Sequence, residues 1–315
     1  MKILIIKLGY SETLDAEIGK IPSLGDVLRT TPILSALKDK YPDSEITWLV
    51  AEEAYLLLNN NKYLDRILIW DDFVPFQLLK ERFDILINLE KIPGVCAIAD
   101  MVDAWVKYGF RFDSQSGTYS AYEKGLDFLN YIQNKNSEKK TNDYWQKVLI
   151  EMIGEKWTGQ EYILGYKPKT TVIYDIGLNY KSGSKWLTKA MPMEKWKELE
   201  SLLLRENYKI SWQEGLNDLY EYIDWLNSCR CIITQDSLGL HIAIALKKKV
   251  IGIFGPTSYE EIYSYKRYQF IIPEINCKYM PCYNSVCQND IFCMDYININ
   301  EINKIIKVIV KSEIL

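Results

Sequence analysis

Two short turns of this sequence contain residues that could act as a catalytic base or bind an anionic ligand. The first is "SLGD", in which Ser23 suits a helix start, Gly25 permits close backbone approach to a ligand, and Asp26 falls in the first helical turn. Unpaired N–H groups and the helix dipole favour an ionised carboxylate there, so Asp26 could act as a general base. Acidic residues are also common at helix starts as caps alone, which is the alternative role for Asp26.

The second turn is "QDSLGLH", which follows an apolar run and opens another helical pattern. We expect a strand to end at Asp236 and a helix to begin just after Ser237, with backbone N–H groups suited to a phosphate. His241 is the only histidine in the chain. It could donate a hydrogen bond to a bound anion or be structural, but it has no neighbours at metal-ligand spacing.

Three further turns could contribute to the same site. Lys185 in "SGSKW" could neutralise a departing anion, or it could be an ordinary surface lysine. Glu214 in "SWQEG" could accept hydrogen bonds from both hydroxyls of a ribose, although a solvent-facing turn residue is the alternative. Thr257 in "FGPT" follows the next expected strand and should face the same edge of the sheet. Because no Asp-x-Asp motif lies at a strand end, we expect chemistry that needs no metal.

Four of the seven cysteines lie in one short, Pro- and Asn-punctuated stretch, at Cys277, Cys282, Cys287 and Cys293. Four thiolates could hold a structural zinc or iron ion, with no coordination position left for substrate. The spacing differs from the usual pair of Cys-x-x-Cys knuckles. Partly buried thiols that pack a loop are therefore the alternative.

Strand-like apolar runs alternate with helical periodicity in two series along the chain, which predicts parallel sheets. Strands are expected at 2–8, 45–50, 66–70, 84–89, 171–176, 208–212, 231–234 and 250–254, and helices at 25–40, 52–60, 144–153, 193–207, 216–227, 240–246 and 300–310. Pro32 should kink or restart the first helix. "GYKPKT" (165–170) is typical of a linker. We therefore predict an α/β fold with two doubly wound domains, 1–165 and 166–315, whose ligands meet the carboxyl ends of the strands.

The composition argues against a nucleic-acid-binding, secreted or membrane-spanning protein. The chain has 315 residues, 48% of them apolar, which suffices for two cores, and its formal charge of −4 argues against a nucleic-acid binder. The opening apolar run is too short for a signal peptide, and no run of about 18 apolar residues occurs anywhere. We expect a cytoplasmic protein with at most peripheral membrane contact.

The segments "SLGDVLRTTPIL", "SGSKW", "QDSLGLHIAIALKKK" and "FGPTS", in this order, resemble the ADP-heptose:lipopolysaccharide heptosyltransferases of glycosyltransferase family 9. The resemblance implies a GT-B fold, with an acceptor-side N-terminal domain and a donor-binding C-terminal domain that ends in a helix. It also implies inverting transfer from ADP-heptose to a saccharide or glycolipid acceptor of lipopolysaccharide or another surface glycan, at the inner face of the inner membrane. Asp26 would be the base, Lys185 would meet the donor, and Asp236, Ser237, Leu238, Gly239 and His241 would hold the nucleotide diphosphate.

The sequence departs from the family pattern at two places. Tyr10–Ile21 separates the first strand from Gly25-Asp26, as an acceptor-side loop or a plain surface insertion, and Leu238 stands where a glycine is common. A binding protein that has lost the chemistry and a protein-modifying heptosyltransferase are alternative functions. A nicotinamide-dependent oxidoreductase is disfavoured, because no Gly-x-Gly-x-x-Gly follows a strand.

Overall fold

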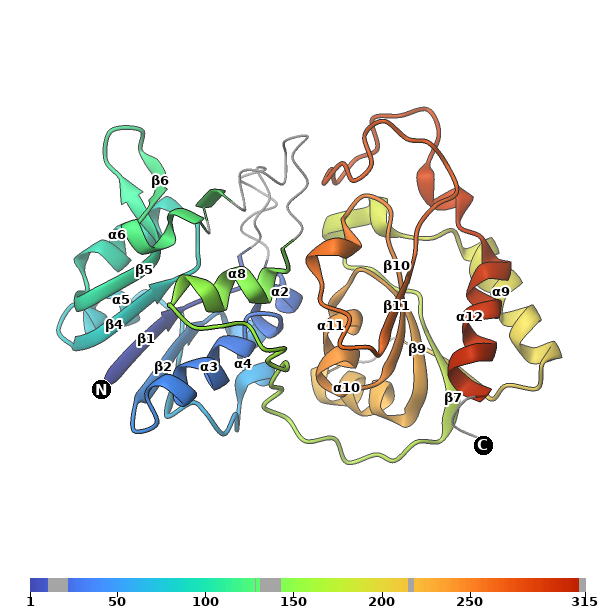
Figure 1. The fold of residues 1–315 in the computed structure, drawn as a ribbon, viewed down its shortest axis with the longest axis horizontal. Coiled ribbons are helices and arrows are strands. Elements are labelled where there is room, and N and C mark those ends of the chain that lie inside the picture. Colours follow the sequence, from blue (N-terminus) through green and yellow to red (C-terminus); the bar gives the residue numbers. More distant parts are fainter. Residues whose placement is uncertain (11–21, 128, 131–142, 215–217, 312–315) are drawn as a thin grey trace. The chain divides into compact units, whose positions relative to one another are not determined.

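The computed structural model describes the chain except residues 11–21, 128, 131–142, 215–217 and 312–315 (Figure 1). It forms two compact units, each described here by itself. The first contains Met1–Tyr166 and Glu261–Tyr263, and the second contains Lys167–Glu260 and Ser264–Leu315.

The first unit is built on a six-stranded sheet in the order β3-β2-β1-β4-β5-β6. Every neighbouring pair is parallel except β5 and β6. The strands are β1 (Lys2–Ile6), β2 (Glu45–Val50), β3 (Arg66–Ile69), β4 (Arg82–Asn88), β5 (Asp103–Asp113) and β6 (Thr118–Ala121). The helices are α2 (Leu24–Leu28), α3 (Pro32–Lys40), α4 (Glu52–Leu58), α5 (Val74–Leu78), α6 (Pro93–Met101) and α8 (Trp145–Met152), with the 3-10 turn η1 (Glu123–Gly125).

The continuous apolar run of β1 follows from burial of both faces of the sheet. Ile3 and Ile5 pack into a cluster with α3 and α8, whereas Leu4 and Ile6 pack into another with α5 and α6. Because successive side chains of a strand point to opposite faces, a strand covered on both sides needs apolar residues at every position.

The helix predicted at 25–40 is divided in two. Pro32 stands in the first turn of α3, so the predicted restart at this proline is confirmed. Proline suits this position because its missing N–H would have no intrahelical partner there. Ser23 occupies the N-cap of α2 with extended backbone, but its hydroxyl makes no capping hydrogen bond in the described structure.

The second unit has a five-stranded parallel sheet in the order β11-β10-β9-β7-β8. Its strands are β7 (Tyr174–Asn179), β8 (Ile210–Trp212), β9 (Cys229–Gln235), β10 (Lys249–Ile253) and β11 (Tyr268–Ile271). Its helices are α9 (Met193–Arg205), α10 (Leu219–Ser228), α11 (Leu238–Ala245) and α12 (Ile299–Lys311), and the 3-10 turns of this half of the chain are η2 (Ser184–Lys189), η3 (Tyr259–Glu261) and η4 (Cys293–Tyr296). Helices α9 and α12 share one core with a face of this sheet (Figure 1). Two parallel α/β sheets confirm the predicted fold class.

The structure also corrects the predicted elements. Residues 92–166, which the sequence pattern leaves irregular, contain α6, β5 and β6, and β11 was not predicted. The strand predicted at 171–176 lies at Tyr174–Asn179 instead, because its buried residues include Gly177 and Asn179 rather than an apolar run. A Cβ at Gly177 would lie 2.7 Å from Cys229 Sγ, so this glycine allows close strand packing.

Each sheet has one point where the strand order reverses. In the first unit it lies between β1 and β4, and in the second unit between β7 and β9. Connections leave these neighbouring strands in opposite directions, which opens a crevice at their carboxyl ends, where ligands of doubly wound proteins bind.

Candidate active site

Asp26 lies beside the reversal point of the first unit. Its carboxylate Oδ1 is 2.9 Å from Nη2 of Arg29, one helical turn further on, and both side chains are largely buried. The Arg29 guanidinium lies over the ring of Trp145, with its carbon 4.4 Å from the ring centroid. Within the same unit, Glu261 Oε2 is 4.0 Å from Arg29 Nη1. These contacts hold an acid and a cation at the start of α2.

The turn before α2 is tied to the end of β1. Ser23 N–H donates to Gly9 O, Asp26 N–H donates to Ser23 O at 3.0 Å, and Tyr10 forms an isolated antiparallel bridge with Pro22. Gly9 has a φ of +101°, and a Cβ there would lie 2.9 Å from Val27 Cγ2. The two residues on either side of 11–21 are therefore paired; residues 11–21 themselves lie outside the described structure.

Asp236 directly follows β9 and is the centre of a polar cluster in the second unit. Its Oδ2 accepts hydrogen bonds from Lys189 Nζ and Thr257 Oγ1, both at 2.7 Å. The three residues come from η2, the end of β9 and the turn after β10. Parallel strands bring their carboxyl ends to one edge, which explains how distant segments meet here.

Electrostatics keep Asp236 ionised. Burial alone would raise the pKa of this carboxyl, but the charges of Lys189 and His241 and the hydrogen bonds from Lys189 and Thr257 outweigh it and lower the pKa from 3.8 to about 2. Lys189 Nζ also lies 5.0 Å from the ring centroid of Trp186. The cluster therefore presents a fixed ion pair in front of α11.

A buried hydrogen-bond network fixes the start of α11. Asn179 Nδ2 donates to Thr234 Oγ1 at 2.7 Å and to Ser237 Oγ at 3.3 Å, and Tyr222 OH donates to Asn179 Oδ1 at 2.8 Å. A Cβ on Gly239 would lie 2.3 Å from both Asn179 Nδ2 and Tyr222 OH. Only glycine fits at that position, so the first turn of α11 packs directly against the end of β7.

Polar groups without a hydrogen-bond partner in the described residues lie at the carboxyl end of β9. Gln235, the last residue of β9, is fully buried, and its amide oxygen and nitrogen have no hydrogen-bond partner in the described part of the chain. The first N–H groups of α11 also lack intrahelical acceptors, as at any helix start. Lys189 and the N–H groups of the first turn of α11 are of the kinds that bind an anionic, hydrogen-bonding ligand.

The other residues predicted to bind the sugar donor lie in three different places. Ser237 is the N-cap of α11, Leu238 is its first residue, and His241 is buried within it. Glu214 is an exposed residue just after β8. Gly25 belongs to α2, in the first unit, and not to the polar cluster of the second.

The lysine of the cluster is Lys189, which sequence reasoning missed. Lys185 lies in the same turn, η2, but its side chain is outside the described structure. Both lysines are polar residues of one loop, so residue type and local pattern do not distinguish them. The sequence signal that favours Lys189 is its position at the end of η2, shortly before Pro192 and the start of α9.

The four cysteines predicted as a metal site lie in the segment between β11 and the start of α12. Cys287 is exposed and the other three are half-buried. Burial raises the pKa of Cys293 to about 11, and the neighbouring Cys282, Cys277 and Cys287 add to the effect. Across the described ranges, no group of three or more His, Cys, Asp or Glu side chains is placed to hold a metal ion. The four-thiolate geometry predicted for zinc or iron is therefore not formed in this structure.

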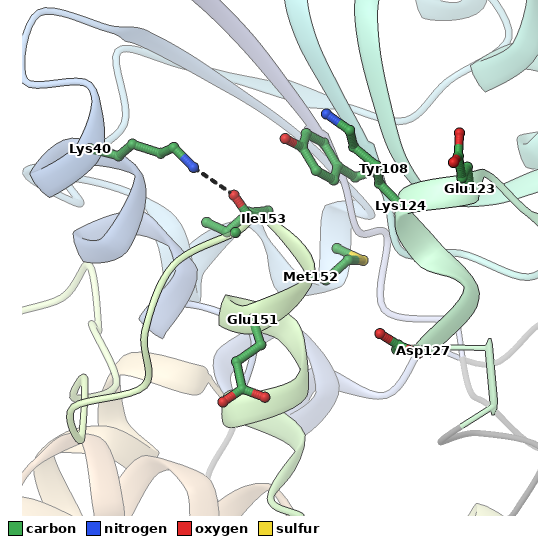
Figure 2. A pocket seen from close by; sticks show the side chains of 9 residues that line it. Lys40, Tyr108, Glu123, Lys124, Asp127, Glu151, Met152 and Ile153 are labelled. Atoms are coloured by element: carbon green, nitrogen blue, oxygen red, sulfur yellow. Dashed lines mark hydrogen bonds between the residues drawn. The ribbon is translucent and has the colours of Figure 1, made fainter.

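A separate cavity of about 370 Å³ lies in the first unit, lined among others by Lys40, Tyr108, Lys124 and Glu151 (Figure 2). Lys40 Nζ donates to Ile153 O at 2.8 Å, which satisfies a carbonyl at the end of α8. None of the predicted site residues lines this cavity.

Comparison with known proteins finds a family match in the second half of the chain. Residues 215–292, which include the start of α11 and the turn after β10, match the model of glycosyltransferase family 9 (heptosyltransferase). The matched segment spans less than half of the chain and contains the motifs "QDSLGLHIAIALKKK" and "FGPTS". The match agrees with the family predicted from the sequence, and the chain is a glycosyltransferase.

The fold of this glycosyltransferase matches solved heptosyltransferases over their full length. Escherichia coli ADP-heptose lps heptosyltransferase II is similar with a TM-score of 0.68 and 14% identity, covering 100% of both chains. Escherichia coli heptosyltransferase WaaC with ADP-2-deoxy-2-fluoro heptose has a TM-score of 0.63 and 16% identity, covering 98% of this chain and 99% of that one. The predicted GT-B fold is confirmed.

A third similar structure is the iron-containing dodecameric glycosyltransferase TibC from enterotoxigenic Escherichia coli. It has a TM-score of 0.60 and 12% identity, and covers 99% of this glycosyltransferase and 76% of TibC. Comparison with curated proteins finds no significant match. Among the helices in the described ranges, none is long and apolar enough to cross a membrane.

Proposed function

We propose that this glycosyltransferase moves a heptose, or a related sugar, from an ADP-sugar to a saccharide or glycolipid acceptor of lipopolysaccharide or another surface glycan. The transfer is a single displacement at C1 and therefore inverts the configuration of the sugar. In this proposal, residues 1–165 form the acceptor side and residues 166–315 hold the donor. The preference for ADP is supported by the similar WaaC structure, which contains ADP-2-deoxy-2-fluoro heptose.

The observation that carries the proposal is the polar cluster at the start of α11. A departing nucleotide diphosphate needs positive charge and aligned N–H dipoles. The helix start supplies the dipoles, and Lys189, held at 2.7 Å by Asp236, supplies a positioned charge. A lysine ammonium has three donors, so it can bind a phosphate oxygen while it remains bonded to Asp236.

The first unit supplies the acid–base group in this mechanism. Asp26 accepts the proton of the acceptor hydroxyl as that oxygen attacks C1, while the bond from C1 to the diphosphate oxygen breaks. Arg29, 2.9 Å away, fixes the direction of the Asp26 carboxylate. The chemical step needs no metal in this scheme, because Lys189 and the α11 N–H groups stabilise the leaving diphosphate.

Nucleotide release from ADP-heptose, UDP-sugars and GDP-sugars, with a panel of truncated glycan acceptors, tests the activity. We expect turnover with ADP-heptose and a drop of about 10²–10⁴ in kcat for Asp26→Asn, which keeps the size of the side chain but not the basic oxygen. ADP binding by that variant should persist. Undiminished turnover in Asp26→Asn would remove the base from the mechanism, and ADP binding without turnover for any acceptor would favour a binding protein.

Calorimetry with ADP tests the donor site and decides between two lysines. Lys189→Ala should weaken ADP binding by about 10-fold or more, the loss expected for one charge-assisted hydrogen bond. Lys185→Ala is the matched control, because it removes the same charge from the same turn. A larger effect at Lys185 would restore the assignment predicted from the sequence, and equal wild-type affinity in both variants would place the diphosphate elsewhere.

A further inference from the structure

The loop that contains Lys189 is attached to the cysteine-rich segment, residues 277–293, which follows β11 (Figure 1). The hydroxyl of Thr188, the residue before Lys189, donates to the carbonyl oxygen of Asn284 at 2.6 Å. Thr188 is only 6% exposed, so water competes little for its hydroxyl. Lys189 itself donates to Asp236 at 2.7 Å. The lysine is therefore held from two directions, by its own ammonium and through the residue that precedes it.

The same turn of the cysteine-rich segment is attached to the loop that contains Thr257. The Tyr283 N–H donates to the Pro256 carbonyl at 2.8 Å, and Thr257, the next residue, donates its hydroxyl to Asp236. Tyr283 has a φ of +51°, a backbone conformation that is uncommon for a residue with a side chain and that persists where surrounding contacts fix it. The turn therefore has a defined shape, in which Tyr283 and Asn284 bond to two different loops.

The far end of the cysteine-rich segment packs against the turn after β10. A Cβ on Gly255 would lie 2.6 Å from Sδ of Met294 and 3.1 Å from Sγ of Cys293. Glycine at this position allows the thioether and the thiol to pack directly on the backbone. The segment therefore contacts the turn after β10 at two places.

These contacts complete a closed ring that includes the polar cluster. The ring passes from Asp236 to Lys189, back along the chain to Thr188, across to Asn284 and Tyr283, across again to Pro256, and through Thr257 to Asp236. The turn η2 has little regular structure of its own with which to fix Lys189, because it is a 3-10 turn of six residues interrupted by non-helical backbone angles at Trp186. The position of Lys189 therefore depends on the contacts of its neighbours.

We propose that the turn formed by Tyr283 and Asn284 positions Lys189 for the departing diphosphate, and that the Thr188 hydroxyl transmits this position. The inference rests on the proposed role of Lys189 at the sugar donor. Thr188 and Asn284 are positioning residues, since the charge that binds the diphosphate belongs to Lys189. Without the Thr188 hydrogen bond, η2 loses one attachment, and Lys189 spends part of its time away from the place where it bonds to Asp236 and a phosphate oxygen together. ADP then binds less tightly, because only a fraction of the protein is ready to bind it.

Calorimetry with ADP tests the effect on binding. Thr188→Val removes the hydroxyl and keeps the shape of the side chain, and we expect the affinity for ADP to fall about 3- to 10-fold. Thr188→Ser keeps a hydroxyl and should restore the affinity to within about twofold of the wild type. In turnover, the KM for the sugar donor should rise in Thr188→Val while the KM for the acceptor stays unchanged.

Thr170→Val is the matched control. The Thr170 hydroxyl also donates to a backbone carbonyl, that of Asp224 at 2.7 Å, and it lies in the same unit just before the amino end of β7. This variant should bind ADP as the wild type does, although the urea midpoints of both valine variants should fall by similar amounts. If Thr188→Val does not fold, Thr188→Ala makes the same comparison.

The reactivity of the Lys189 amine measures its position without a ligand. Brief acetylation with acetic anhydride, followed by mass spectrometry, compares the rate at Lys189 with the rate at exposed Lys197 on α9. The bond to Asp236 protects Lys189 in the wild type. Its relative rate should therefore rise about threefold or more in Thr188→Val, and it should keep the wild-type value in Thr188→Ser and Thr170→Val.

The outcomes separate this inference from the proposed function. An unchanged acetylation rate of Lys189 in Thr188→Val overturns the positioning role, and so does faster acetylation with wild-type ADP affinity. A loss of ADP affinity that Thr188→Ser does not restore, or an equal loss in Thr170→Val, also overturns it, because a general loss of structure would then explain the effect. Wild-type ADP affinity in Lys189→Ala instead overturns the donor site of the proposed function, and the positioning for ADP falls with it.

Discussion

The polar cluster at Asp236 makes the sharpest prediction about stability. The pKa of this carboxyl is lowered from 3.8 to about 2 in the folded chain. A shift of nearly two units, at about 1.4 kcal/mol for each, corresponds to roughly 2 kcal/mol of folding free energy. Because the folded pKa is depressed, this contribution is fully present above pH 3.8 and is lost as pH falls through about 2. Asp236→Asn should therefore destabilise the protein by about 2 kcal/mol or more near neutral pH, since it also leaves Lys189 without its carboxylate.

Urea unfolding of the wild type and of Asp236→Asn, at pH values from 8 down to 3, measures this difference. We expect it to stay constant between pH 8 and 5 and to shrink only below about pH 4. Thr257→Val is the control, because it removes a hydrogen bond to the same oxygen but no charge; it should cost about 1 kcal/mol near pH 7, with a smaller pH dependence in the same acid range. Equal stability of wild type and Asp236→Asn at pH 7, or a difference that disappears between pH 7 and 5.5, would refute the reasoning.

Three further outcomes are expected. Gly239→Ala should destabilise the protein by about 1–3 kcal/mol in urea unfolding and weaken ADP binding, because its methyl group would overlap Asn179; unchanged values would mean that the end of β7 can move. Iodoacetamide at pH 7.5, followed by mass spectrometry, should label exposed Cys287 well before Cys293, whose pKa of about 11 keeps it protonated, whereas protection of Cys287 until a chelator is added would reveal a metal site. Deletion of Glu12–Lys20 should leave ADP affinity intact and impair turnover with saccharide acceptors, and full turnover would make the segment a plain insertion.

The parallel core could be predicted because its strands are continuous apolar runs. β2 lies at the predicted residues, and the run Ile3–Ile6 is buried on both faces of its sheet. β5 could not be found in this way, because Lys107, Arg111 and other charged residues interrupt it. Its partner β6 is an antiparallel edge strand of four residues, whose identity depends on pairing rather than on its own pattern.

Only part of the candidate site could be predicted from the sequence, because some of its residues are brought together by contacts between distant segments. Asp236 and Thr257 follow apolar strands, so the rule for carboxyl ends of parallel strands indicates them. Lys189 contacts Asp236 across 47 residues of chain, and no local pattern encodes that contact.

The bridge between Tyr10 and Pro22 has a consequence for how this enzyme could diversify. Because the two ends of the intervening segment are paired, its length and composition can change while the chain still leaves β1 and enters α2 at the same points. Lengthening a closed loop costs little, since its entropy grows only with the logarithm of its length. Evolution can therefore exchange the segment as a module and alter what meets this side of the protein, with the position of Asp26 inherited unchanged.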